Sequence, residues 1–88
     1  MSSNVQQTSI ESFHSLDDLN TRQAAIYMWI DMLKNATNLE ISHKSHIPIN
    51  QVTPRTNELV KLGYVEQFEK RTCKVSGRTA IAWRVMPR

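Results

Sequence analysis

The stretch VTPRTNELVKLGYV, residues 52–65, decides the fold of this 88-residue chain. Val52, Thr56 and Leu59 stand at the spacing of one helical face, which predicts an amphipathic helix that turns these residues to a core. Gly63 stands where a left-handed residue ends a helix, because glycine adopts a positive φ without steric cost. The stretch therefore predicts a helix that stops before Gly63 and continues into an extended segment.

The start of this helix has two candidate positions. Asn50 can serve as the N-cap, because its side-chain oxygen can accept a free amide of the first turn. Alternatively, Thr53 can be the cap and Pro54 the first helical residue, where a missing N–H costs nothing. Both alternatives place the helix after a turn that spans residues 47–50.

Two further helices are predicted upstream of this turn. TRQAAIYMWIDMLK, residues 21–34, contains no Gly or Pro, and Asn20 or Thr21 can cap it. LEISHKSH, residues 39–46, can form a short helix that Pro48 ends, because proline lacks an amide proton and crowds the preceding turn. The apolar residues of the first of these helices share one face: Ile26, Trp29, Ile30 and Leu33.

The chain after Gly63 changes to strand periodicity, which predicts a β-hairpin. Its loop, residues 72–78, contains Ser76 and Gly77 as turn residues. Four basic residues stand in or just before this loop: Lys70, Arg71, Lys74 and Arg78. The two apolar runs that would form the strands are Tyr64, Val65 and Phe68, then Ile81, Trp83 and Val85.

Length and composition indicate one small domain. The chain is 40% hydrophobic, and residues 13–88 can form a single core behind a polar, flexible arm at residues 1–12. One cysteine, Cys73, excludes an internal disulfide, and no apolar run approaches a membrane span. We therefore expect a soluble cytoplasmic protein in which Cys73 is a buried, passive thiol.

The charge is unevenly distributed along the chain. Residues 1–46 contain three basic and five acidic residues, whereas residues 47–88 contain eight basic and three acidic ones. A basic second half in a small domain indicates a polyanionic partner, and nucleic acid is the first candidate.

This order of elements is that of the winged helix-turn-helix, an α+β fold in which a three-helix bundle precedes a two-stranded antiparallel β-hairpin wing. Residues 52–65 resemble the recognition helix and wing entry of winged-helix DNA-binding proteins. RTCKVSGRTAIAWRV, residues 71–85, is similar to the wing of small winged-helix proteins of phages and prophages. TSIESFHSL, residues 8–16, and LNTRQ, residues 19–23, are similar to members of the same group.

The resemblance implies a small phage-type transcriptional regulator of double-stranded DNA in the cytoplasm of a bacterial host. The third helix would enter the major groove, and the wing would lie on the backbone or in the minor groove. No ligand-sensing or dimerisation domain follows the wing, so we expect no sensing regulator. The expected DNA contacts are Gln51, Thr53, Pro54, Arg55, Asn57 and Lys61 from the helix, with Lys70, Arg71, Lys74 and Arg78 from the wing.

Individual roles follow from side-chain chemistry. Arg55 can reach a guanine or a phosphate, and Gln51 and Asn57 can read adenine. Glu58 would repel phosphate, so we expect it to pair within the molecule with Arg55 or Lys61.

Two other functions stay open. A winged helix can bind a protein and modify a host or phage assembly, or it can bend DNA as an architectural or recombination factor. A second apolar stripe, Ala25, Met28 and Met32, fits either a first helix that is buried on most sides or a homodimer face. The segment with Ile10, Phe13, Leu16 and Leu19 is another candidate contact with a partner subunit.

Catalytic and metal chemistry find no support in the sequence. His43 and His46 stand at i and i+3, but no third ligand follows at a recognisable spacing. No nucleophile with an adjacent base, phosphate-binding loop or HExxH motif is present. We therefore expect neither enzymatic activity nor a metal, cofactor or small-molecule ligand.

Overall fold

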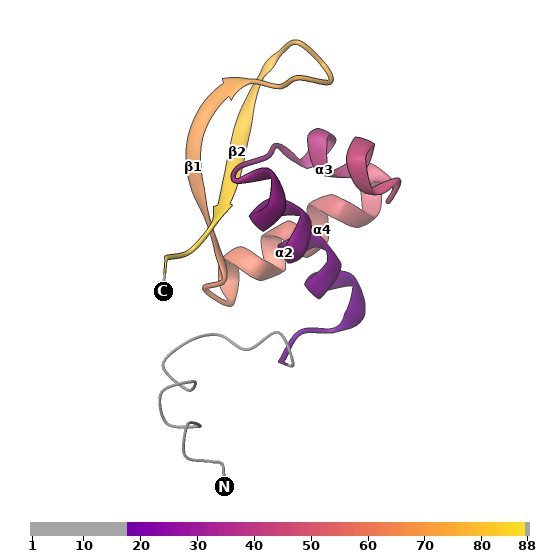
Figure 1. Ribbon diagram of the computed structural model, residues 1–88, viewed down its shortest axis with the longest axis vertical. Helices are drawn as coiled ribbons and strands as arrows, with labels where there is room; N and C mark the ends of the chain where they lie inside the picture. The colour runs from indigo at the N-terminus through magenta and orange to yellow at the C-terminus, as the bar shows by residue number, and fades with distance from the viewer. Residues whose placement is uncertain (1–17, 88) are drawn as a thin grey trace, which may run out of the picture.

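A computed structural model describes residues 18–87, and Figure 1 shows its elements. Three helices come first: α2 at Thr21–Leu33, α3 at Asn38–Ser45 and α4 at Ile49–Lys61. Two strands follow, β1 at Val65–Thr72 and β2 at Thr79–Val85, and they form an antiparallel hairpin. The predicted three-helix bundle with a β-hairpin wing is confirmed. The polar arm at residues 1–12 and the apolar repeat at residues 10–16 lie outside the described residues.

Helices α2 and α3 both begin with a capping box. In α2 the Asn20 side chain accepts the Gln23 amide at 2.8 Å, and the Gln23 side chain accepts the Asn20 amide at 3.1 Å. In α3 Thr37 and Glu40 make the same reciprocal pair, at 3.2 and 3.1 Å. His46 ends α3 with a φ of 64°, in the left-handed region.

Helix α4 begins earlier than either predicted start. Pro48 is its N-cap and makes no side-chain cap hydrogen bond, so neither Asn50 nor Thr53 caps the helix. Pro54 lies inside the helix, where its missing N–H deprives the Asn50 carbonyl of the usual intrahelical donor. Both predicted starts are too late because Pro48 already supplies the non-helical residue before the helix, so that Asn50 and Thr53 lie inside it.

The end of α4 matches the prediction. Gly63 has a φ of 85°, and its amide donates to the Val60 carbonyl at 3.1 Å. The Tyr64 amide donates to the Leu59 carbonyl at 2.9 Å, which completes the pair of hydrogen bonds typical of a glycine helix end. This tight turn fixes the direction in which the chain leaves α4 and enters β1.

The core lies between the helices and the inner face of the hairpin. The predicted inward residues of α4, Val52, Thr56 and Leu59, are fully buried. On α2, Tyr27 is buried although it was not among the predicted core residues. The other fully or nearly fully buried apolar residues are Leu19, Ile26, Ile30, Ala36, Ile41, Tyr64, Val65, Cys73 and Ala82, with Trp29 and Leu33 partly buried against them.

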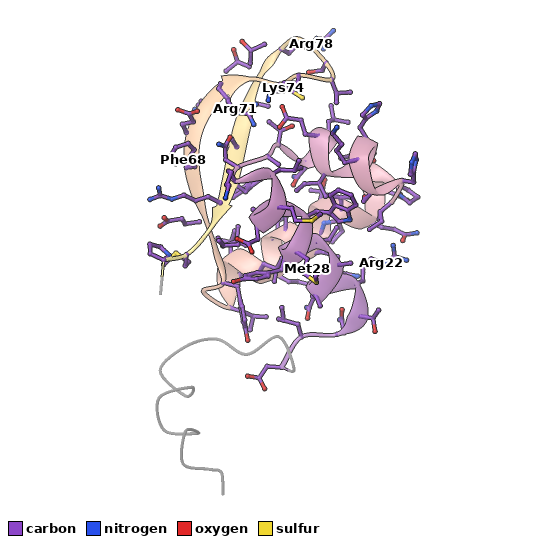
Figure 2. The ribbon with its side chains drawn as sticks, viewed as in Figure 1. Arg22, Met28, Phe68, Arg71, Lys74 and Arg78 are labelled. Carbon is purple, nitrogen blue, oxygen red and sulfur yellow. The ribbon has the colours of Figure 1, made fainter. Side chains whose placement is uncertain are left out.

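The stripe with Met28 and Met32 is not covered. Met28 is 52% exposed and Met32 is 60% exposed, so the interpretation of α2 as a helix buried on most sides is wrong. The physical reason is geometric: α3, α4 and β2 contact the inner side of α2, and no element of residues 18–87 packs on its outer side. Figure 2 labels Met28 on this outer side.

Strand β2 lies in the middle of a small extended surface. It pairs with β1 along one edge, and on its other edge Trp83 exchanges two backbone hydrogen bonds with Ala36, at 3.0 and 2.8 Å. The regular pairing of β1 is interrupted around Phe68, which forms a bulge between Gln67 and Glu69. The bridge to Ala36 attaches the wing to the loop between α2 and α3.

Candidate nucleic-acid interface

Helix α4 presents one polar face to solvent. Gln51, Pro54, Asn57 and Lys61 are exposed on the side away from the buried residues, and Thr53 and Arg55 are half-buried at its borders. All six predicted helix contacts therefore lie on or beside this face. Asn50 is exposed there too, and the sequence reasoning missed it because it treated Asn50 as a cap.

The one acidic residue of α4 is held by two partners. The Glu58 carboxylate accepts from Arg55 Nη2 at 2.8 Å and from Gln23 Nε2 at 2.7 Å. The hydrogen bond from Gln23, followed by that from Arg55, lowers the pKa of Glu58. The predicted pairing of Glu58 with Arg55 is confirmed, and the contact with Gln23 on α2 was not foreseen. The carboxylate is compensated, so it does not leave a bare negative charge on the α4 surface.

Three of the predicted wing cations are exposed. Lys70 lies on β1, and Lys74 and Arg78 lie at the two ends of the loop that closes the hairpin. Figure 2 shows Arg78 at the tip of the wing and Lys74 just below it. Within residues 18–87, none of the three takes part in an ion pair.

The loop that carries Lys74 and Arg78 is closed by its own hydrogen bonds. The Cys73 amide donates to the Arg78 carbonyl, and the Gly77 amide donates to the Cys73 carbonyl, each at 2.8 Å. Gly77 has a φ of 75°, a conformation that side-chain-bearing residues rarely adopt. The wing tip is therefore a defined turn that carries cations.

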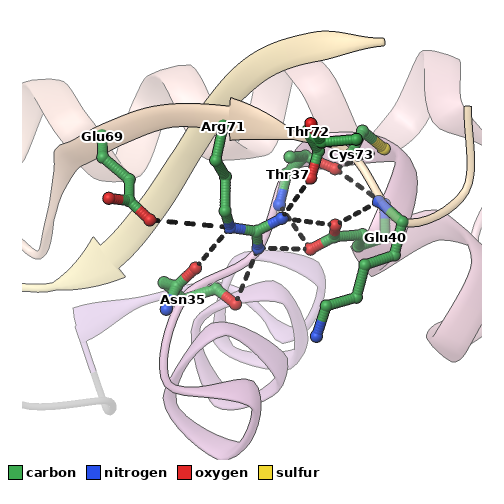
Figure 3. A network of polar contacts seen from close by, with 8 residues as sticks. Asn35, Thr37, Glu40, Glu69, Arg71, Thr72 and Cys73 are labelled. Atoms are coloured by element: carbon green, nitrogen blue, oxygen red, sulfur yellow. Dashed lines mark hydrogen bonds and ion pairs between the residues drawn. The ribbon is translucent and has the colours of Figure 1, made fainter. Parts of the chain in front are cut away.

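Arg71 differs from the other wing cations because it points into the molecule (Figure 3). Its Nη1 and Nη2 donate to the two Glu40 carboxylate oxygens at 2.7 Å each, and its Nε donates to Asn35 Oδ1 at 2.9 Å. Nη1 and Nη2 also donate to the Thr72 and Asn35 carbonyls, at 3.0 and 3.4 Å. All five N–H groups of the guanidinium thus have intramolecular acceptors. This arrangement disfavours a direct DNA contact by Arg71.

Glu40 is the acceptor at the centre of this network. Besides Arg71, it accepts the Lys74 backbone amide at 2.8 Å and the Thr37 amide at 3.1 Å. The hydrogen bonds from Arg71 are the largest cause that lowers the pKa of Glu40 to about 2, against the opposing effect of burial. Glu40 is therefore a buried, charged group with a full set of donors, and nothing in its sequence context singled it out.

The histidines of α3 and the single cysteine do not form a metal site among residues 18–87. No group of three His, Cys, Asp or Glu side chains is placed to hold a metal ion there. Cys73 is buried, as expected, and its thiol lies 3.1 Å from the Thr37 hydroxyl. Burial raises the pKa of Cys73, but hydrogen bonds from Thr37 and the loop outweigh burial and leave the pKa lowered. The described helices include none that is long and apolar enough to cross a membrane.

The fold resembles that of solved antibiotic-resistance repressors. A mutant MarR from E. coli aligns with a TM-score of 0.60 and 18% identity over 81% of this chain and 51% of that chain. A structure described as the multiple antibiotic resistance repressor MarR aligns with a TM-score of 0.59 and 17% identity, over 92% and 55%. This chain thus spans about half the length of each structure.

At this level of identity the likeness shows the winged-helix fold alone. No protein-family model matches the chain, and no curated protein does. The two structures lend no support to a phage origin.

Proposed function

We propose that this protein binds double-stranded DNA and acts as a small transcriptional regulator, with α4 in the major groove. The observation that carries the proposal is the exposed face of α4, which presents amides and a lysine while Gln23 and Arg55 hold its one carboxylate. The fold likeness to proteins named repressors supports the same role. A phage-type regulator in a bacterial cytoplasm, without enzymatic activity or cofactor, remains part of the proposal.

Base reading is assigned to the amides of α4. Gln51 and Asn57 are exposed, and each amide has a donor and an acceptor that match the major-groove edge of adenine. Lys61 near the end of the helix is suited to a phosphate or a guanine. Arg55, held by Glu58, can donate to DNA only with the N–H groups that this ion pair leaves.

Backbone contact is assigned to the wing. Lys70, Lys74 and Arg78 are exposed, and such cations bind phosphates or a narrow minor groove without reading sequence. Arg71 belongs to the wing as a residue that holds its shape, since its N–H groups already have acceptors.

The first test is titration of a labelled random-sequence duplex by fluorescence anisotropy at several salt concentrations. Binding at micromolar Kd or tighter is expected, with log Kobs falling by about 0.9 per phosphate contact for each log unit of salt. Selection from a random pool would then identify the preferred site. Absence of binding at about 50 mM salt would refute the DNA function.

Variants separate the two parts of the interface. Lys74→Gln and Arg78→Gln should weaken binding to all sequences and flatten the salt dependence. Asn57→Ala or Gln51→Ala should relax the preference at one or two base pairs while the salt dependence stays the same. Arg22→Gln is the charge-matched control for the wing, because Figure 2 shows exposed Arg22 on α2, far from the wing tip.

A second candidate function is protein binding through α2. The exposed thioethers of Met28 and Met32, with Ala25 beside them, form an apolar stripe on the outer side of the helix. We propose a homodimer contact on this stripe. Sedimentation of wild type and Met28→Lys tests it, since the variant should be monomeric where the wild type is dimeric.

A gel assay for bending of bound DNA would distinguish an architectural role from simple promoter binding.

A further inference from the structure

Among residues 18–87, one ion pair joins the wing to the helices. Arg71 lies near the end of β1, and Glu40 lies in the first turn of α3. The pair is short and well shielded, with side-chain exposures of 20% and 9%. Asn35, from the loop between α2 and α3, accepts from the same guanidinium (Figure 3). The end of β1 therefore meets the start of α3 and the loop just before it, which are more than 30 residues away in the sequence.

We propose that the Glu40–Arg71 pair fixes the angle of the wing against α3 and α4 and thereby positions Lys74 and Arg78 for DNA phosphates. The inference rests on the proposed DNA function and deepens it by naming two positioning residues, neither of which touches DNA. In this arrangement the charge of Arg71 pairs with Glu40 within the protein and does not contact a phosphate.

We call the Glu40–Arg71 pair the joint, meaning the contact that holds the wing rigidly against α3. The wing needs such a contact because of how the hairpin is attached. Its base is connected to α4 through the tight turn at Gly63, whereas its tip lies one strand length away, roughly 25 Å for eight residues. A hairpin held only at its base would pivot, and the tip would move most. The Ala36–Trp83 bridge holds β2 near its middle, and the Glu40–Arg71 pair holds the opposite strand where it enters the loop.

The same carboxylate also fixes the loop itself. Glu40 Oε2 accepts the backbone amide of Lys74 at 2.8 Å, so the residue that carries a proposed phosphate contact is anchored at its main chain. Beside it, the Cys73 thiol lies 3.1 Å from the Thr37 hydroxyl at the start of α3. These contacts order the wing tip before DNA arrives, which reduces the entropy lost on binding.

The wing provides a matched control for this pair. Arg84 and Glu66 are paired residues on β2 and β1, and their ion pair is equally short at 2.6 Å. It is more exposed, at 43% and 30%, and it links the two strands of the hairpin to each other and not to a helix. Arg71→Gln and Arg84→Gln each remove one positive charge and one short ion pair, but only the first releases the wing from α3. Arg71→Gln also removes a longer contact with Glu69, at 3.9 Å, which lies on β1 like Arg71 itself.

The experiment compares DNA binding of these variants across salt concentrations. Arg71→Gln should weaken binding at low salt by about tenfold or more and should reduce the salt slope by nearly 2, the share of two phosphate contacts at about 0.9 each. Arg84→Gln should change affinity by less than about threefold, because one phosphate contact at most is at stake. Equal slopes for the two variants would overturn the proposal.

Glu40→Gln is a further test, because the proposal and simple electrostatics predict opposite changes in DNA affinity for this variant. The glutamine can keep the reciprocal cap with Thr37, as Gln23 does in α2, so the helix start is preserved. Removing a negative charge from the protein should by itself tighten DNA binding. The joint predicts weaker binding and a smaller salt slope, and tighter binding would contradict it. Arg71→Lys, which keeps the charge but not the two-pronged contact, should fall between wild type and Arg71→Gln.

Amide hydrogen exchange of the free protein separates failure of the joint from failure of the DNA function. The Lys74 amide should exchange at least about tenfold faster in Arg71→Gln than in Arg84→Gln, while the amides of α2 keep their protection. Unchanged exchange at Lys74 would refute the joint even if wild type binds DNA. If wild type binds no duplex, the proposed function and the role of the pair in it both fall, whatever the exchange rates are.

Discussion

Helices α2 and α4 are each thirteen residues long and each bury three residues in the core, yet their hydrogen bonding differs. Helix α2 begins with a capping box and contains no proline. Helix α4 begins at Ile49 after Pro48, which provides no side-chain cap, and Pro54 interrupts its hydrogen bonds on the exposed side. The inner faces of the two helices thus bury the same number of residues, whereas the ends and outer faces differ in hydrogen bonding. In α4, tertiary packing of the buried residues therefore supplies the stability that capping and intrahelical hydrogen bonds do not. The outer residues of α4 are not those that would best stabilise a helix, which fits a role in binding.

Removal of a core side chain should destabilise the protein to a similar extent from either helix, because both helices pack on the same core. Leu59→Ala and Ile30→Ala should each lower the free energy of unfolding by about 2–5 kcal/mol, since each leaves a cavity at a fully buried site. Urea unfolding followed by the fluorescence of Trp29 and Trp83 measures the loss. A loss below about 1 kcal/mol at Leu59 would show that α4 is not held by its inner face.

Acid should weaken α3, the helix between them, through a charge and not through packing. The pKa of Glu40 is lowered from 4.5 to about 2, so its ionised form stabilises the fold fully above pH 4.5 and ceases to do so as the pH falls towards 2. The contribution is about 3 kcal/mol, from 1.36 kcal/mol per pH unit.

Urea unfolding between pH 5 and 2 tests this by comparing wild type with Glu40→Gln. Wild type should lose about 3 kcal/mol more stability than the variant over this range. Parallel curves for the two proteins would mean that the carboxylate contributes no more in the folded protein than in the unfolded chain.

Removal of the α2 cap should make the start of α2 resemble that of α4. Asn20→Ala deletes the acceptor for the Gln23 amide and should cost about 1 kcal/mol of folding stability. DNA affinity should be unchanged, since Asn20 lies outside the proposed interface. Chemical denaturation reports the first quantity and anisotropy the second, and a change in affinity without a change in stability would contradict the assignment.

Replacement of the proline inside α4 should have the smallest effect, and it should raise the free energy of unfolding. Pro54→Ala restores the donor to the Asn50 carbonyl and should raise the free energy of unfolding by about 0.5–1 kcal/mol, reduced by the greater freedom of the unfolded chain. Thermal unfolding measures the gain. If Pro54 shapes the DNA-contacting face, Pro54→Ala should also bind the preferred DNA site more weakly. A variant that is less stable than wild type would contradict the prediction and show that the start of the helix depends on the proline.

Much of the fold could be predicted because its signals are local. The 3.6-residue period of Val52, Thr56 and Leu59 is a property of neighbouring residues, and Gly63 marks a backbone conformation that few other residues adopt. The start of α4 was misplaced because Pro54 fits both a first-turn position and, at a cost, a helix interior. Met28 and Met32 could not be assigned because an apolar stripe does not reveal whether a neighbour covers it.

The candidate site was only partly predictable for a related reason. Exposed residues of α4 follow from the buried ones by rotation about the helix axis, so the exposure of Gln51, Asn57 and Lys61 could be predicted. Arg71 was placed with the other wing cations because sequence shows charge but not direction. Its partner Glu40 is 31 residues away, and no periodic pattern connects a helix N-terminus with the end of a strand.

On its outer edge β2 is covered at Trp83 by the bridge to Ala36, whereas the outer edge of β1 pairs with no strand of the described structure. An open edge can recruit strands from other molecules and seed aggregates. Here the bulge at Phe68 breaks the flat hydrogen-bonding pattern, and Arg84 covers the exposed ring at 4.9 Å. Charged Glu69 and Lys70 follow directly along the same strand. The bulge, the covered ring and the two charges are features that oppose pairing of this edge with a strand from another molecule.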